Sequence, residues 1–259
     1  MLPVVLSFVI TALWVTVATV VAERWGTKVG AVVTTLPSSA VVAFWFIGVE
    51  QGADFAARTA VVIPAEMGIN VVFLGLFVAL SRRGLPVALA GALGCWTVLS
   101  ALLYASDIDD LLLSWLLFLA SIAGVTAWLR VSHRFAQQEG RSIAYTPGEL
   151  AFRGLFAGLM ISVSVVGAAV AGPVVAGILA IFPAIFTSTM VILFLRQGRE
   201  FTGAVGTIMV VSSTNVVVFT TVVHLAFPEL GVAPGTLAAL AVSYAWSFGM
   251  YLAVMRWVR

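Results

Sequence analysis

Glu66 is the residue whose type and position most strongly suggest chemistry, because it lies well inside the apolar stretch 59–80. A carboxyl group deep in a stretch that could span a membrane is costly, and it is rare unless it is protonated, paired or facing water. Asn70 follows four residues later, on the same face of a helix. The pair predicts a site for a proton, a cation or a positively charged substrate. The alternative is structural: a protonated Glu66 that hydrogen-bonds Asn70 or Asn215 and holds two helices together.

A second polar cluster is neutral and lies in the apolar stretch 202–227. It consists of Ser212, Ser213, Thr214 and Asn215. A shift of the sequence by 146 positions, without gaps, places residue 66 opposite Ser212. Hydroxyl and amide oxygens are suitable ligands for hard cations. We therefore expect this cluster and Glu66 to form one site near the middle of the membrane, with the identity of any metal left open.

Two apolar stretches contain a proline among hydroxyl side chains, which predicts interrupted helices. The candidates for helix break and gating are Thr34, Thr35, Pro37, Ser38 and Ser39 in the first stretch, and Pro183, Thr187 and Ser188 in the second. Proline removes a backbone donor and frees a carbonyl one turn earlier, and nearby hydroxyls can satisfy that carbonyl or face a cavity. The pattern favours a segment that bends between two states, and the alternative is a kink satisfied by neighbouring helices.

The composition places these residues in a membrane protein. Of the 259 residues, 62% are hydrophobic and 9% are charged, whereas soluble domains average about 45–50% apolar and about 25% charged residues. The net charge is +2 and the 13 basic residues do not form a basic domain or tail, so nucleic acid is not an expected partner. With one cysteine, two histidines and no glycine-rich phosphate loop, the sequence predicts neither a cofactor nor an enzyme.

Nine apolar windows are about as long as a membrane-spanning helix, which needs roughly 20 residues. They are 2–22, 29–49, 59–80, 85–105, 111–129, 154–171, 174–195, 202–227 and 235–257. The sequence therefore predicts an all-α integral membrane protein with nine transmembrane helices.

The basic residues predict the orientation of these helices. With nine spans, all 13 but Arg58 fall on one side, and Lys and Arg concentrate on the cytoplasmic side of membrane proteins. The residues of that side are Arg24, Lys28, Arg82, Arg83, Arg130, Arg134, Arg141, Arg153, Arg196, Arg199, Arg256 and Arg259. The N-terminus is expected outside and the C-terminus inside.

The same shift of 146 positions indicates an internal repeat. It aligns Pro37 with Pro183 and Gly52 with Gly198, and it places the first four windows on the last four. The expected organisation is repeat 1 in residues 1–105, a linker helix and cytoplasmic loop in 106–146, and repeat 2 in 147–259. Because one span separates the repeats, the second is inverted relative to the first, a construction common in secondary transporters.

Short segments of the two halves resemble the GlpM-like family of small bacterial membrane proteins. The resemblance lies in the segment Gly26 to Pro37 with Gly52 downstream, and in Gly172 to Pro183 with Gly198. It implies a fused tandem of two such units. Glu66 is not part of the family pattern, and the family implies no activity for this chain.

These patterns predict a secondary transporter that moves a small solute or a cation by alternating access, coupled to protons or to another cation. Its partners would be the lipid bilayer and the small-molecule or ion substrate, with a homo-oligomer left open. The expected location is a cell membrane, the plasma membrane of a prokaryote. The alternative function is a membrane accessory or scaffold protein that does not transport.

Overall fold

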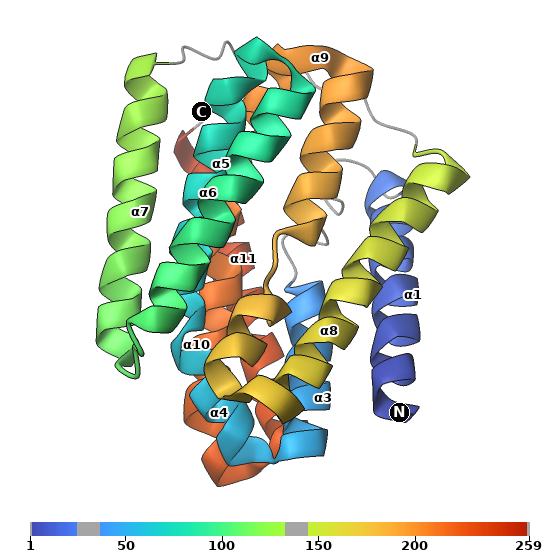
Figure 1. The fold of residues 1–259 in the computed structure, drawn as a ribbon, viewed down its shortest axis with the longest axis vertical. Helices are drawn as coiled ribbons and strands as arrows, with labels where there is room; N and C mark the ends of the chain where they lie inside the picture. The colour runs from blue at the N-terminus through green and yellow to red at the C-terminus, as the bar shows by residue number, and fades with distance from the viewer. Residues whose placement is uncertain (1, 25–36, 133–144, 258–259) are drawn as a thin grey trace.

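The computed structural model describes residues 2–24, 37–132 and 145–257, and in these ranges all regular structure is helical. The elements are α1 (Leu2–Arg24), α3 (Ser38–Gln51), α4 (Ala53–Val61), α5 (Ile63–Leu80), the 3₁₀ helix η1 (Ser81–Arg83), α6 (Leu85–Ala105), α7 (Leu111–Ser132), α8 (Pro147–Ala180), α9 (Ala184–Ser212), α10 (Thr214–Leu230) and α11 (Val232–Trp257). They form one elongated bundle, with α1 and α7 at opposite edges in Figure 1.

Five stretches of the described chain are long and apolar enough to cross a membrane. They are Leu2–Val20, Ile63–Arg83, Leu85–Ala105, Leu111–Arg130 and Pro147–Leu230. The last has 84 residues, so it exceeds a single crossing of about 20 residues, and the chain turns back within it (Figure 1). The all-helical, strongly apolar architecture is therefore compatible with a membrane protein.

Helix α5 forms the centre of the bundle. Its buried residues include Ala65, Gly68, Val71, Phe73 and Phe77, which lie on all sides of the helix. A helix that is apolar all round is buried rather than amphipathic, and α5 packs against α6, α7 and α9. In contrast, α1 and α7 expose many large apolar side chains, as expected for helices that face lipid.

Several predicted spans are distorted or interrupted helices. The expected helices 59–80 and 202–227 are locally distorted at Val62, between α4 and α5, and at Ser213, between α9 and α10, where both residues keep right-handed helical φ and ψ. The window 174–195 is split between the end of α8 and the start of α9 at 181–183. Apolar composition is the same on both sides of such breaks, so hydropathy alone does not reveal them.

Glycines with positive φ reverse the chain between the helical segments. Gly172 (φ 82°) bends α8 and Gly198 (φ 79°) bends α9. Both have φ in the left-handed region, which side chains with a Cβ rarely occupy.

Backbone features recur between the two halves of the chain. Pro37 (φ −75°, ψ 50°) precedes α3 and Pro183 (φ −72°, ψ 42°) precedes α9. Gly52 and Gly198 both have positive φ (96° and 79°). Gly84 (φ 100°) precedes α6 and Gly231 (φ 78°) precedes α11. The two members of each pair are 146 or 147 residues apart, close to the offset of the sequence repeat.

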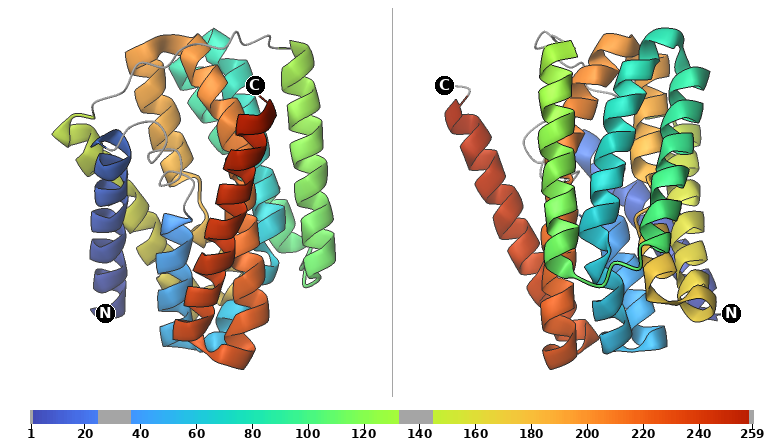
Figure 2. Two further views of the ribbon diagram at one scale, coloured as in Figure 1. Left: turned by 180° about the vertical axis from the view of Figure 1, so that it is seen from behind. Right: turned by 60° about the vertical axis from the view of Figure 1, so that its left-hand side comes forward.

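The two ends of the bundle differ in the segments that form them. The end of α1, η1, the end of α7, the start of α8 and the bend of α9 lie together at the upper end in Figure 1. The start of α1, α4 and the bend of α8 lie at the lower end, as Figure 2 shows from two other sides. The upper segments contain most of the basic residues, whereas Arg58 lies in α4 at the lower end.

Candidate functional site

Glu66 lies near the middle of the chain segment formed by α4 and α5. It comes thirteen residues after the start of α4 at Ala53 and fourteen before the end of α5 at Leu80. At 1.5 Å per residue, about 20 Å of helix separates it from either end. Its side chain has no exposed surface. The tertiary structure therefore places the carboxyl group deep in the interior of the bundle.

The carboxyl group of Glu66 is only partly satisfied. Ser100 on α6 donates a hydrogen bond from its Oγ to Oε1 over 2.8 Å. The indole N–H of Trp96, one turn earlier on α6, lies near the same carboxyl without completing a hydrogen bond. Among the described residues, neither Glu66 Oε2 nor Trp96 Nε1 has a hydrogen-bond partner. One carboxyl oxygen is thus available to a proton or to a ligand.

Asn70 faces the break between α8 and α9. Its Nδ2 donates to the carbonyl oxygen of Ile181 over 2.8 Å and approaches Met67 Sδ at 3.5 Å. The backbone of Ile181 is no longer helical (φ −117°, ψ 22°). Its carbonyl therefore lacks the donor that a continuous helix would supply. The Asn70 side chain replaces that donor. Its own Oδ1 has no partner among the described residues.

The break itself is lined by aromatic rings. Phe182 contacts Trp96 edge to face, with 4.9 Å between ring centroids, and Phe156 in the same way at 5.8 Å. Edge-to-face contacts at these distances are favourable. Trp96 therefore contacts the interruption on one side and lies beside Glu66 on the other, which links the carboxyl group to the broken helix.

Pro183 begins the helical segment after the break. Its carbonyl accepts from the Thr187 backbone N–H over 2.7 Å, which closes the first turn of α9. No side chain caps the start of this helix. The Thr187 hydroxyl is buried and has no partner in the part of the chain that the structure describes. Ser188 donates to the carbonyl of Ile185 within its own helix, over 3.1 Å. The proline therefore coincides with a complete interruption near the middle of the bundle, visible as an extended stretch in Figure 1.

The equivalent segment of the first half is described only from Pro37 onward. Thr34 and Thr35 lie outside the described residues, as does the side chain of Ser38, which begins α3. Pro37 is buried, and its carbonyl accepts from the Val41 N–H over 2.9 Å. Ser39 is half-buried. The start of α3 therefore matches the start of α9 in its backbone.

The second polar cluster does not join Glu66 through any hydrogen bond among the described residues. Its three hydroxyls bond to carbonyls of α9 about one turn earlier in the chain: Ser212 to Ile208, Ser213 to Val210 and Thr214 to Val211. Such back-bonding is common for Ser and Thr in helices. The hydroxyls are therefore engaged locally and do not converge with the carboxyl group.

Asn215 and Thr214 contact α11 instead. Asn215 Oδ1 accepts a hydrogen bond from Ser243, and Thr214 Oγ1 accepts one from Trp246 over 3.1 Å. The boundaries at Val62 and Ser213 are 151 residues apart, whereas the flanking pairs Gly52/Gly198 and Gly84/Gly231 are 146 and 147 residues apart. The local register between these glycines therefore differs in the two halves.

The sequence did not single out Trp96 and Ser100, which lie beside Glu66, or Arg153, which contacts α9. Trp96 and Ser100 are four apart on one face of α6, a weak signal that becomes informative only when α6 is known to pack against α5. Arg153 was assigned to a cytoplasmic connection by its charge. It lies near the start of α8 and is buried between helices, with 8% of its surface exposed and its Nη1 donating to Thr189 Oγ1 over 2.7 Å.

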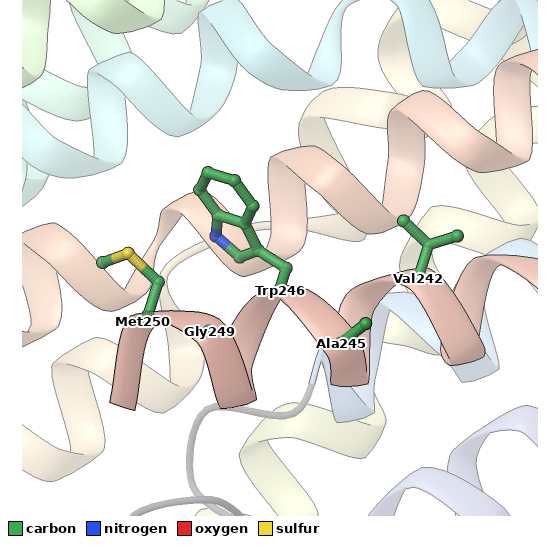
Figure 3. Close-up of a pocket in the computed structure, with 5 residues that line it drawn as sticks. All are labelled: Val242, Ala245, Trp246, Gly249 and Met250. Atoms are coloured by element: carbon green, nitrogen blue, oxygen red, sulfur yellow. The ribbon is translucent and has the colours of Figure 1, made fainter. Parts of the chain in front are cut away.

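The described residues contain no candidate metal site, and their apolar groove lies apart from Glu66. There is no group of three or more His, Cys, Asp or Glu side chains that could hold a metal ion in that part of the chain. A shallow apolar groove runs along α11 and is lined by Val242, Ala245, Trp246, Gly249 and Met250 (Figure 3). None of these residues contacts Glu66, so the groove and the carboxyl site are separate.

Comparison with protein-family models, with curated proteins and with solved structures finds no match for this chain. The resemblance to the GlpM-like family stays a prediction from the sequence.

Proposed function

We propose that this chain is a secondary transporter that works by alternating access. It has nine transmembrane spans, with the N-terminus outside and the C-terminus inside, and two inverted repeats joined by α7. The recurring prolines and positive-φ glycines in the two halves support the repeat. The grouping of basic segments at one end of the bundle supports the orientation.

The single observation that carries this proposal is the incompletely bonded carboxyl of Glu66 beside an interrupted helix. Interrupted helices near the membrane midplane, at the interface of inverted repeats, are where transporters bind substrates and coupling ions. Glu66 Oε2 lacks a partner among the described residues, and Trp96 connects the carboxyl to Phe182 in the break. Binding or loss of a proton at Glu66 would change the contacts that hold this segment.

Asn70 couples the carboxyl group of Glu66 to the interrupted helix. Its hydrogen bond to Ile181 holds the C-terminal end of the half-helix 173–180 against α5. Glu66 lies one turn earlier on the same helix. A rearrangement of α5 that exposes the carboxyl to water would also displace the Asn70 amide from the break, so proton exchange and helix movement would occur together.

A transport assay with a matched control tests the proposal. Proteoliposomes carrying a pH gradient would be exposed to pools of small carboxylates, amines and sugars, with a pH-sensitive dye inside. One pool should accelerate collapse of the gradient with the wild type and not with Glu66→Gln, which keeps the size of the side chain but cannot carry the proton. Glu50→Gln, at an exposed carboxyl group at the end of α3, should behave like the wild type.

The second candidate is an accessory or scaffold protein, and the complete burial of Glu66 against packed helices favours it. In that case Glu66 is a protonated side chain that bonds α5 to α6 through Ser100. Infrared spectroscopy separates the two functions, since transfer to D₂O shifts the carboxyl band if water reaches the group. Exchange within minutes supports a transporter, and protection for as long as the slowest backbone amides supports the scaffold.

A further inference from the structure

Arg153 is a buried cation for which the described part of the chain supplies no carboxylate. Its guanidinium donates from Nη1 to the neutral hydroxyl of Thr189 over 2.7 Å and lies 5.2 Å above the ring centroid of Tyr145. Its Nε has no hydrogen-bond partner among the described residues. A guanidinium has five N–H donors, and a buried charge is normally compensated by an opposite charge.

The natural partner of Arg153 is Glu149, four residues earlier on the same helix, a spacing that favours a Glu–Arg pair. Both oxygens of Glu149 are otherwise engaged. Oε2 accepts from the Thr146 backbone N–H (2.7 Å) and from its hydroxyl (2.9 Å) in a capping box. Arg196 donates to Oε1 over 2.8 Å and to Oε2 over 2.9 Å. Arg196 therefore pairs with the Glu149 carboxylate, and Arg153 does not.

We propose that Arg153 and Thr189 bind the oxyanion group, carboxylate or phosphate, of a small soluble anion that is the transported substrate. This inference rests on the proposed transport function and assigns its substrate class. An arginine presents paired donors that match the two oxygens of a carboxylate or phosphate. The Nε and the Nη groups provide such a pair, and the Thr189 hydroxyl provides a further contact.

Arg153 and Thr189 lie on the two helices that meet at the helix break. Arg153 belongs to α8, whereas Thr189 belongs to α9 shortly after the interruption at Pro183. Phe156, one turn beyond Arg153, packs against Phe182 in the break. An anion held between Arg153 and Thr189 would therefore join α8 to the segment that begins at the interruption.

The charges of the two sites are complementary. Entry of a monovalent anion at Arg153 together with a proton at Glu66 transfers no net charge. A proton-coupled symport of this kind would be electroneutral for a monovalent anion. The substrate would carry its negative charge to the basic end of the molecule, where the potential of Arg153 and its neighbours attracts it.

The test measures anion binding directly and does not require transport. The full-length protein in nanodiscs of phosphatidylcholine would be titrated with acetate, succinate and inorganic phosphate at constant ionic strength, with chloride as the reference. The dependence of the unfolding midpoint on concentration yields a dissociation constant for each anion. The same titration would be made on Arg153→Gln, Arg153→Lys, Thr189→Val and the control Arg58→Gln, which removes an exposed cation at the other end of the bundle.

At least one of the carboxylates or phosphate should bind the wild type and Arg58→Gln equally. Arg153→Gln should weaken that binding about tenfold or more, because a charge-assisted hydrogen-bond pair is lost. If Arg153→Gln does not fold, Arg153→Lys decides the question: it keeps the charge but loses the paired donors, and should also weaken binding. Thr189→Val should weaken binding by a smaller factor.

Three results would overturn the proposal: no anion stabilises the wild type, the Arg153 variants bind as tightly as the wild type, or stabilisation requires phosphatidylglycerol in the nanodisc. The last result would assign Arg153 to a lipid headgroup instead of a soluble anion. Failure here leaves the proton step at Glu66 intact, because the proteoliposome and infrared experiments measure that step separately.

Discussion

Replacement of Asn70 by leucine tests whether its amide holds the broken helix in place. The perturbation is local: leucine has a similar volume and is apolar, but it cannot donate the 2.8 Å hydrogen bond to the Ile181 carbonyl. That carbonyl would then lie at a helix interruption with no other hydrogen-bond donor among the described residues. We expect the half-helix 173–180 to lose stability at its C-terminal end.

The magnitude follows from two opposing effects. Leaving a buried carbonyl without a partner costs about 1–3 kcal/mol, whereas hydrogen bonds between membrane helices average about 0.6 kcal/mol with a maximum near 1.7. The substitution also removes the Asn70 Oδ1, which is buried without a partner in the described structure, and this offsets part of the loss. We therefore expect Asn70→Leu to lower the free energy of unfolding by about 1 kcal/mol.

Hydrogen exchange monitored by mass spectrometry provides the local measurement. A loss of about 1 kcal/mol corresponds to roughly fivefold faster exchange, and it should be concentrated in residues 176–182. Thr221→Val is a matched control, because it removes the 3.0 Å hydrogen bond from Trp115 at a site away from the break. Unchanged exchange at the break in Asn70→Leu, or the same acceleration in the control, would refute the role assigned to Asn70.

Three further predictions concern packing, backbone and charge. In Gly158→Ala, the new Cβ would lie 2.7 Å from the Phe8 carbonyl oxygen of α1. The free energy of unfolding, measured by denaturant titration, should therefore fall by about 1–3 kcal/mol. Gly124→Ala, which has open space around the new Cβ, should be neutral or slightly stabilising in the same titration. Gly172→Ala meets no neighbouring atom but has φ 82° and ψ −176°, a combination essentially restricted to glycine, so we expect a loss of about 1–3 kcal/mol from backbone strain alone. Arg196→Gln should lower the thermal midpoint only slightly, because a half-exposed ion pair contributes about 0–1 kcal/mol, and the effect should shrink at high salt.

The apolar windows predicted the uninterrupted helices well. The expected window 85–105 coincides with α6, and 111–129 and 2–22 agree with α7 and α1 to within a few residues. The reason is physical: an apolar segment of membrane length must satisfy its backbone hydrogen bonds internally, and a helix does so regardless of its neighbours. The cost of a buried carboxyl also singled out Glu66 from the sequence alone.

The interrupted helices were predicted less completely. Proline marked the break before α9, since it lacks an N–H. Pro64, at the start of α5 two residues after Val62, was a comparable signal that the prediction did not use. Ser213, which follows the end of α9, has no such signal beside it. Equivalent positions in the sequence repeat did not imply contact: Ser212 was placed opposite Glu66, but its hydroxyl bonds the Ile208 carbonyl of its own helix.

What the amino-acid sequence determined by itself was the all-helical, strongly apolar character of the chain and the unusual position of one carboxyl group. The tertiary structure decided which groups meet: Ser100 with Glu66, Asn70 with Ile181, and Arg153 with Thr189. The first two pairs join residues 34 and 111 positions apart. Helical periodicity specifies the face on which a side chain lies, but only the packing of one helix against another specifies the side chain that it contacts.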